Sequence, residues 1–246
     1  MEMVKYMDGV AIKVSGSLVV GENNHINFNF LRELFKVSKT LLDNGLGVGI
    51  ISGGGPLARH FIEAAKKFGI TDARADMVAD KAQRLISSLI ISACHEYAYP
   101  SPIDDLDVAF TALSSKKVVV ISGKFPGQTS DNIATQFAGY VNFKKLVKIT
   151  NVDGVYNADP RSHINAKKFK AMRYDDLIAL TAADTRKPGS STIFDQIAAK
   201  GIKNNKITLF IISKNDTKSI PRLINYGSNA GTLVNENGTR DKINSE

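Results

Sequence analysis

Short runs of β-branched and other apolar residues alternate with longer amphipathic stretches along most of this chain. The apolar runs, which are short enough to be strands, occupy residues 10–14, 48–51, 118–121, 146–149, 207–212 and 232–234. The stretches that predict helices occupy residues 30–42, 56–68, 72–98, 131–140, 190–202 and 219–225, and residues 153–187 predict hairpins with one short helix. This alternation is typical of a mainly parallel sheet whose strands are joined by crossover helices. We therefore expect an α/β fold.

Composition and length fit an ordinary globular protein. The chain has 246 residues, of which 43% are hydrophobic and 23% are charged, which argues against disordered and fibrous classes. Its one cysteine, Cys94, excludes an internal disulfide framework and a cysteine-rich zinc site. The four histidines show no H-x-x-x-H pairing, so we expect no protein-built metal site. Residues 1–8 lack a signal-peptide apolar region, and no apolar run reaches the roughly 18–20 residues that span a bilayer. We therefore expect a cytoplasmic protein with no membrane partner.

The chain is basic, with a formal net charge of +8 and a pI near 9.4. A basic balance suits nucleic acid, but it suits small phosphorylated ligands equally well. The lysines are spread along the chain in pairs, and no basic run with interleaved aromatic residues marks a stacking platform. We therefore expect no nucleic-acid partner.

Glycine and hydroxyl residues follow four of the predicted strands. Ser15-Gly16-Ser17 follows the first strand, and Ser52-Gly53-Gly54-Gly55 follows the second and leads into a helix that begins at Pro56. In open α/β sheets, ligands bind at the edge where the carboxyl ends of the strands meet. Glycine lets backbone N–H groups approach phosphate oxygens, and a following helix adds its positive N-terminal end. The sequence predicts a phosphate site here, although a tight strand-to-helix turn also uses glycine.

Two standard nucleotide motifs are absent. No G-x-x-x-x-G-K-[ST] string occurs, so the chain is not a P-loop enzyme. The glycines at 45, 47 and 49 have the wrong third spacing for G-x-G-x-x-G, and they precede the strand that they should follow. We therefore expect no Rossmann dinucleotide site.

Three charged residues lie where they can act on a phosphate. Lys13 interrupts the apolar run of the first strand just before its end, either as an edge lysine or as a cation that neutralises a transferring phosphoryl group. Arg59, one turn into the helix after the glycines, is either a solvated arginine or a phosphate ligand. Asp131 follows Thr129-Ser130 at a helix start, which is also an ordinary N-cap arrangement.

The order and spacing of several strings resemble the amino-acid kinase superfamily and, within it, the archaeal-type UMP kinases. The string T-N-V-D-G-V-Y-x-x-D-P, at residues 150–160, is the most specific of them. The others, from the N-terminus on, are K-V-S-G-S, S-G-G-G-x-x-x-R, Asp76 with Arg84, P-G-Q-T-S-D, G-S-S-x-x-x-D with Ala198-Ala199-Lys200, and Gly231-Thr232. The resemblance covers nearly the whole chain, from Lys13 to Val234.

This resemblance implies a three-layer αβα sandwich that forms one structural domain overall. It implies an acceptor lobe over residues 1–150 with the catalytic lysine, an ATP-binding lobe over 151–235 and a polar tail over 236–246. It also implies synthesis of UDP from UMP with ATP, Mg²⁺ bound to the nucleotide, and a homohexamer built as a trimer of dimers. An acceptor phosphate that is already largely dianionic needs no general base, which agrees with the absence of histidine from these loops.

The resemblance also assigns roles to individual residues. Lys13 and Asp131 are the expected catalytic residues, with Asp131 organising the lysine. The expected UMP-binding residues are Gly54, Gly55, Arg59 for the phosphate, Asp76 for the ribose, and Thr129. The expected ATP-binding residues are Gly16, Ser17, Thr150, Asn151, Tyr156, Asp159, Gly189 and Ser190. No residue is expected to bind a metal directly.

The acceptor side departs from the family pattern, while the ATP-side strings are almost intact. Pro56 replaces a small polar or basic residue, and four further departures follow Asp76, at Ala79, Asp80, Gln83 and Ile86. Two alternatives stay open on this ground. One is a non-catalytic relative that binds a nucleotide or an oxyanion. The other is a kinase of another small phosphate such as isopentenyl phosphate, although that family places a histidine where this chain has Arg59. Carbamate and amino-acid kinases fit the P-G-Q-T-S-D string less well.

Overall fold

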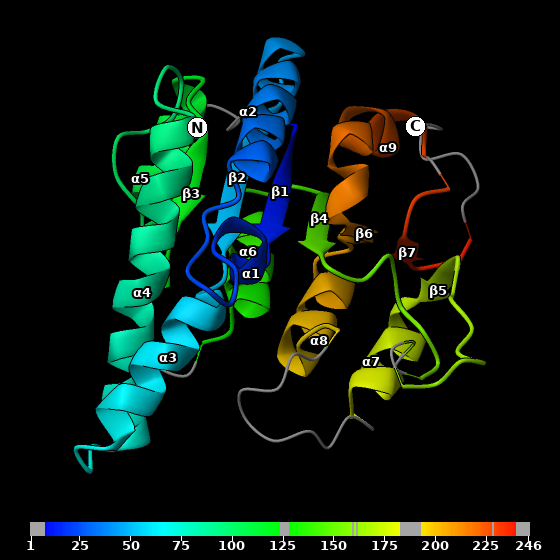
Figure 1. Ribbon diagram of the computed structural model, residues 1–246. Coiled ribbons are helices and arrows are strands. Elements are labelled where there is room, and N and C mark those ends of the chain that lie inside the picture. Colours follow the sequence, from blue (N-terminus) through cyan, green and yellow to red (C-terminus); the bar gives the residue numbers. More distant parts are fainter. Residues whose placement is uncertain are drawn as a thin grey trace.

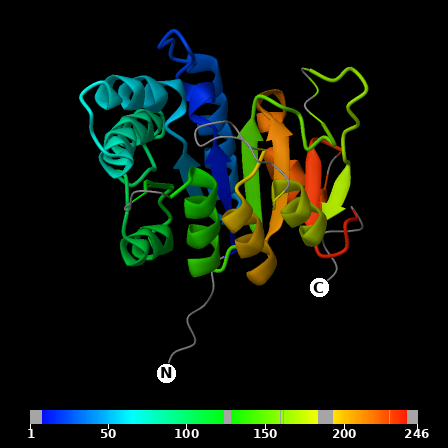
Figure 2. The same cartoon turned by 90° about the horizontal axis from the view of Figure 1, so that it is seen from below.

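The strands form one sheet in the order β3-β2-β1-β4-β6-β7-β5. The structure is a computed structural model that describes residues 8–123, 128–158, 160, 162–182, 193–227 and 229–239. Its strands are β1 (Gly9–Val14), β2 (Gly47–Ser52), β3 (Val119–Ile121), β4 (Lys145–Thr150), β5 (Ala171–Arg173), β6 (Thr208–Ser213) and β7 (Thr232–Asn235). Neighbouring strands are parallel except for β6 and β7. Figure 2 shows β1, β4, β6, β7 and β5 side by side in this order, from blue to yellow-green.

Helices cover both faces of this sheet, so the predicted three-layer αβα fold is confirmed (Figures 1 and 2). One face packs against α2 (Phe28–Asp43), α4 (Asp72–Ala93) and α9 (Ile220–Tyr226). The other packs against α5 (Leu106–Ser114), α6 (Ser130–Tyr140), α7 (Tyr174–Ala182) and α8 (Gln196–Asn204). The remaining elements are α1 (Gly16–Val19), α3 (Gly55–Lys66), which packs on α4, and the 3-10 helix η1 (Lys214–Ser219).

Burial on both faces explains why the central strands are almost continuously apolar. All six residues of β1 and all six of β2 are buried. Val10, Ile12 and Val14 pack in the core under α2, α4 and α9, whereas Ala11 packs in the core under α6 and α8. Each large aliphatic side chain buried in this way stabilises the fold by about 1.5–3 kcal/mol.

The order of the strands reverses its direction between β1 and β4. The chain moves outward from β1 through β2 to β3, then returns to the other side of β1 to form β4 and continues toward β6. The segment after β1 leads to α2 on one face, and the segment after β4 leads to α7 on the other. In open α/β sheets such a reversal leaves a crevice at the carboxyl ends of the two strands, and ligands bind there.

Two predicted helices differ from the structure. The helix predicted over 72–98 ends at Ala93, because Tyr97 and Tyr99 hydrogen-bond to Val118 at the edge of the sheet. The helix predicted over 190–202 begins at Gln196, because Asp195 caps it by accepting a hydrogen bond from the N–H of Ala198 at 2.8 Å. Helices α5 and α1 were not predicted from the sequence.

The predicted lobe boundary at residue 150 coincides with the end of β4, a central strand of the continuous sheet, and the division into lobes stays a prediction. Just before the predicted tail, the Asn235 side chain accepts a hydrogen bond from the N–H of Gly238 and donates one to the carbonyl oxygen of Thr239. Within the described part of the chain, no helix is both long and apolar enough to cross a membrane.

Candidate active site

Two buried lysines lie next to each other at the reversal point of the sheet. Lys13 on β1 and Lys148 on β4 are register partners near the carboxyl ends of their strands, one residue before Val14 and two residues before Thr150. Their side chains are only 8% and 5% exposed. Side chains alternate between faces along a strand, and both Ala11 and Leu146, two residues earlier, pack on the side of α6 and α8. Both lysines therefore lie on that side.

Asp131, in the first turn of α6, lies against both lysines. Its Oδ2 atom is 2.7 Å from Lys148 Nζ and accepts a second hydrogen bond from the backbone N–H of Asp195 at 3.2 Å. Its Oδ1 atom is 3.4 Å from Lys13 Nζ. Thr129 fixes the start of this helix, since its hydroxyl accepts a hydrogen bond from the N–H of Asn132 at 3.1 Å. The expected contact between Lys13 and Asp131 is thus present.

Burial and neighbouring charges set the protonation of this cluster. Burial alone would raise the pKa of Asp131, but the positive charges of Lys148 and Lys13 outweigh it and the pKa is lowered. Burial lowers the pKa of Lys148 to about 8; the Asp131 carboxylate opposes this shift and the charge of Lys13 adds to it. The Lys148 ammonium group also lies 5.2 Å from the centre of the Phe194 ring. With all three groups ionised, the cluster carries a net charge of +1.

The two glycine loops pack backbone to backbone beside these lysines. A Cβ atom at Gly16 would clash with the carbonyl oxygen of Gly53 and would lie 2.6 Å from the backbone nitrogen of Gly55. Gly55 has a φ of +57°, and a Cβ atom there would lie 2.7 Å from the backbone nitrogen of Ser17. Because α3 begins at Gly55, its positive end lies in the same place. We call these two packed loops the glycine cradle, and backbone N–H groups at a helix start of this kind commonly bind phosphate oxygens.

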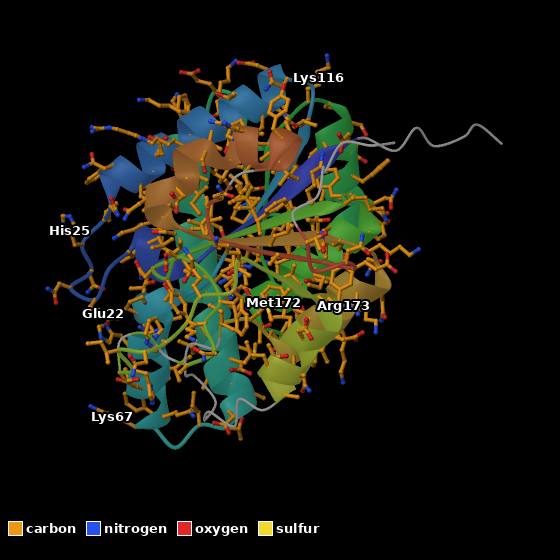
Figure 3. All side chains as sticks on the ribbon, turned by 90° about the vertical axis from the view of Figure 1, so that its right-hand side faces the viewer. Glu22, His25, Lys67, Lys116, Met172 and Arg173 are labelled. Atoms are coloured by element: carbon orange, nitrogen blue, oxygen red, sulfur yellow. The ribbon has the colours of Figure 1, made fainter. Side chains whose placement is uncertain are left out.

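The predicted UMP-binding residues surround the triglycine loop. Gly54 lies against α4, because a Cβ atom at this position would be 3.8 Å from the carbonyl oxygen of Ala79. Asp76 lies half-buried one turn earlier on α4. Arg59, on α3, is half exposed and forms an ion pair of 3.0 Å with Glu22, in the loop after α1. Figure 3 shows Glu22 and His25 of this loop at the periphery of the molecule.

The residues of α4 that depart from the family pattern have different surroundings. Ile86 is buried in the core under α2 and α9, so it is a packing residue. Asp80 pairs with Arg84, which also pairs with Asp104. Gly123 follows β3, and a Cβ atom added to it would lie 4.0 Å from Asp80 Oδ1. The Asp80 carboxylate therefore lies at the edge of the sheet where the carboxyl ends of the strands meet.

The predicted ATP-side residues that the structure describes lie in the loop after β1, at the end of β4 and in the loop that follows β4. The Asn151 side chain donates a hydrogen bond to the Ser17 hydroxyl at 3.2 Å, which links the loops after β4 and β1. The Tyr156 hydroxyl donates to Asp153 at 2.7 Å, and this bond raises the pKa of Tyr156. Thr232 accepts a hydrogen bond from the N–H of Val155 at 2.8 Å. Thr150 ends β4, whereas Asp159, Gly189 and Ser190 lie outside the described residues.

Three residues of this arrangement were not predicted. Lys148 had a readable signal, since the string K-I-T at 148–150 repeats the K-V-S of 13–15 at the end of a second apolar strand. The sequence holds no comparable signal for Glu22 or Phe194. Glu22 contacts Arg59 and Phe194 contacts Lys148, and each contact joins segments that are far apart in the sequence.

A family model described as "Amino acid kinase family" matches residues 9–213, which include every element from β1 to β6. The chain belongs to the amino acid kinase family. Two curated relatives of this chain are the uridylate kinases of Thermococcus kodakarensis and Pyrococcus abyssi. They are 34% and 35% identical to it over 227 residues, which cover 92% of this chain and 98% of each relative.

Solved structures agree with the fold of this member of the family. The crystal structure of uridylate kinase from Archaeoglobus fulgidus superposes with a TM-score of 0.79 at 29% identity, covering 92% of this chain and 99% of that one. The UMP kinase structure from Bacillus anthracis superposes with a TM-score of 0.78 at 20% identity, covering 94% and 97%, and supports the fold alone.

Proposed function

We propose that this chain is a uridylate kinase, which transfers the γ-phosphoryl group of ATP to UMP and releases UDP and ADP. The Lys13–Asp131–Lys148 cluster carries the proposal, because it stands at the strand ends beside a glycine cradle in a chain that aligns with uridylate kinases over nearly its full length. The non-catalytic alternative is not favoured, since a protein that only binds nucleotide has little use for this buried charged cluster.

The chemistry needs positioning and charge neutralisation more than acid–base groups. A phosphate oxygen of UMP attacks the γ-phosphorus of ATP, a new P–O bond forms, and the bond to the β-phosphate oxygen breaks. The attacking phosphate is largely dianionic at neutral pH, so no side chain has to remove a proton. Lys13 neutralises charge on the transferring group, backbone N–H groups of Gly16 and Gly55 bind its oxygens, and Asp131 holds Lys13 in place.

Magnesium is the proposed cofactor, bound to the phosphates of ATP. The cluster has a net charge of only +1, which is less than the negative charge that ATP and UMP bring together. A cation carried on the phosphates fits this balance and would supply the remaining neutralisation.

The proposed UMP site contains Gly54, Gly55, Arg59, Asp76 and Thr129. The proposed ATP site contains Gly16, Ser17, Thr150, Asn151, Tyr156, Asp159, Gly189 and Ser190. The reversal of the sheet between β1 and β4 supports a division in which residues 1–150 form the acceptor lobe and also supply Gly16, Ser17 and Thr150 to ATP, while residues 151–235 supply the rest of the ATP site.

A homohexamer built as a trimer of dimers is the proposed assembly. Four large apolar side chains on and beside α3 and α4 are more than half exposed, namely Phe61, Phe68, Met77 and Leu85, and this supports self-association. The proposed compartment is the cytoplasm, which fits the substrates UMP and ATP. Native mass spectrometry tests the assembly.

An acceptor panel tests the function. Purified protein is assayed with MgATP and, separately, with UMP, CMP, dUMP, AMP and isopentenyl phosphate, and each phosphorylated product is separated and quantified. We expect the highest kcat/KM for UMP. A preference for isopentenyl phosphate, or binding of ATP without turnover of any acceptor, would overturn the assignment.

A further inference from the structure

Lys148 is the nearest cation to the central carboxylate, although the predicted mechanism assigns it no role. The distance from its Nζ atom to Asp131 Oδ2 is 2.7 Å, against 3.4 Å from Lys13 Nζ to Asp131 Oδ1. The first distance is an ordinary charge-assisted hydrogen bond, and the second lies beyond the usual range for an N–H···O bond. Asp131 Oδ1 is accordingly a buried oxygen without a hydrogen-bond partner among the described residues.

The hydrogen bonds of Asp131 therefore divide unequally between its two oxygens. Oδ2 accepts from Lys148 and from the backbone N–H of Asp195, which fixes the carboxylate between β4 and the start of α8. Oδ1 lies 3.4 Å from Lys13 Nζ, so it attracts the positive charge of Lys13 without accepting a hydrogen bond from it. Lys13 is kept near Asp131 by this attraction, while its N–H groups stay available to an incoming phosphoryl group.

The charges of Lys13, Asp131 and Lys148 also indicate a role for Lys148. With Lys148 protonated, one carboxylate is shared between two lysines, and the cluster stays positive. Without that charge, Asp131 and Lys13 would neutralise each other in a buried place where Coulomb interactions are strong. The attraction of the cluster for a phosphoryl group would then be weaker.

We propose that Lys148 is a positioning residue of the phosphoryl transfer, which holds Asp131 and offsets its charge so that Lys13 remains free to contact the transferring group. This inference rests on the proposed kinase activity and deepens it. Lys148 acts through Asp131, and no contact between Lys148 and a substrate is required.

The groups that face Lys148 come from four elements. They are Asp131 on α6, Lys13 on β1, and Asp195 and the Phe194 ring at the start of α8, while Ile211 is its apolar register partner on β6. The pKa of Lys148, about 8, places the loss of its charge within the range where the enzyme can be assayed. Activity should therefore fall as pH rises through 8, because Lys148 loses its positive charge. A lysine that only packs in the core would not produce this pH dependence.

The test compares Lys148→Met and Lys148→Arg with wild-type protein and with the control Lys145→Met, a lysine at the other end of the same strand that pairs with Asp8. UDP is quantified directly from pH 6.5 to 9.5 at saturating MgATP, and circular dichroism checks folding. For Lys148→Met at pH 7 we expect kcat about 10–100-fold lower, the size of loss that follows misplacement of a catalytic group. We expect KM for UMP to change little, and the loss of kcat above pH 8 to disappear.

The arginine variant separates charge from packing. Arginine stays protonated throughout this range, so Lys148→Arg should retain activity above pH 8 where the wild type loses it. The control should match the wild type at every pH. A wild-type kcat that stays constant between pH 7 and 9.5 would overturn the inference. This measurement uses the wild-type protein alone, so it does not depend on whether a variant folds.

Equal kcat and equal pH profiles in the wild type and a folded Lys148→Met variant would overturn this inference alone. An inactive wild type would instead overturn the proposed function, and this inference with it.

Discussion

Lys13 and Lys148 are register partners on the neighbouring parallel strands β1 and β4, where the strand order reverses direction. A single carboxylate, that of Asp131, lies against both of their side chains. The carboxyl ends of these strands thus hold two buried cations at the place where an open α/β sheet binds its ligands. The glycine loops after β1 and β2 adjoin the same place and add backbone N–H groups.

Lys13→Ala should reduce turnover with little effect on the fold. Removing a group that stabilises charge in the transition state lowers kcat by about 10²–10³-fold in enzymes of known mechanism. We expect a loss of this size in steady-state assays with UMP, while Lys145→Ala, on the neighbouring strand, stays near the wild-type rate. An unchanged kcat in folded Lys13→Ala would remove this lysine from the mechanism.

The ion pair between Arg59 and Glu22 predicts opposite effects of two substitutions. Arg59→Ala should raise KM for UMP about 10–100-fold, because a hydrogen bond to a charged group contributes about 1.5–3 kcal/mol. Glu22→Gln should lower this KM by no more than about 5-fold, since it frees Arg59 from an exposed ion pair worth at most about 1 kcal/mol.

Asp72→Asn is the matched control for Glu22→Gln, because Asp72 forms a similar exposed ion pair with Lys66 at 2.8 Å. This variant should leave KM for UMP unchanged. If Glu22→Gln raises KM, Glu22 does not compete with the phosphate for Arg59.

Gly16→Ala should reduce both stability and activity. The added Cβ atom meets the carbonyl of Gly53 and the nitrogen of Gly55, which are backbone atoms and have little room to move. We expect the free energy of unfolding to fall by about 1–3 kcal/mol, as for other overpacked positions. Gly21→Ala is the control, since a Cβ atom there lies 3.8 Å from its nearest neighbour. Equal urea midpoints for the two variants would contradict the packing of the glycine loops.

The lowered pKa of Lys148 predicts how its contribution to stability depends on pH. Its pKa is about 8 in the folded protein and 10.5 ordinarily, so the unfolded chain binds more protons between these values. The free energy of unfolding therefore rises with pH in this window, because the cost of burying the charged amine disappears.

Urea denaturation of the wild type and Lys148→Met at pH 7 and 9.5 measures this effect. The stability of the wild type relative to the variant should increase by about 1–3 kcal/mol between the two pH values. Taking this difference cancels groups that both proteins share, such as the Cys94 thiol, whose pKa burial raises to about 11. A relative stability that stays constant or falls would contradict the burial of a charged Lys148.

Much of the fold follows from the sequence, because buried parallel strands must be apolar and their helices must be amphipathic. The strands around Ile12, Ile50 and Val147 were predicted within one or two residues of their observed bounds. The end of α4 was not predicted correctly, because the helical pattern of apolar residues continues past Ala93. The helix ends there because Tyr97 and Tyr99 hydrogen-bond to the backbone of Val118, which is distant in the sequence.

Local motifs singled out several residues that lie in contact in the structure, whereas residues that are joined only by long-range contacts were missed. The contact of Lys13 with Asp131 and the contact of Ser17 with Asn151 join residues that the motifs had singled out. Lys148 was passed over because a lone lysine in a strand is ambiguous until the register places it beside Lys13. The departure at Ile86 became interpretable only when its side chain was located in the core.

The transfer reaction itself is the decisive measurement for the proposed kinase activity. Phosphorus NMR of the wild-type protein with MgATP and UMP follows the γ-phosphate of ATP and the β-phosphate of UDP in one sample. We expect UDP and ADP to form in equal amounts, and only when UMP is present. ADP that accumulates with inorganic phosphate and without UDP, or a spectrum that does not change, would contradict it.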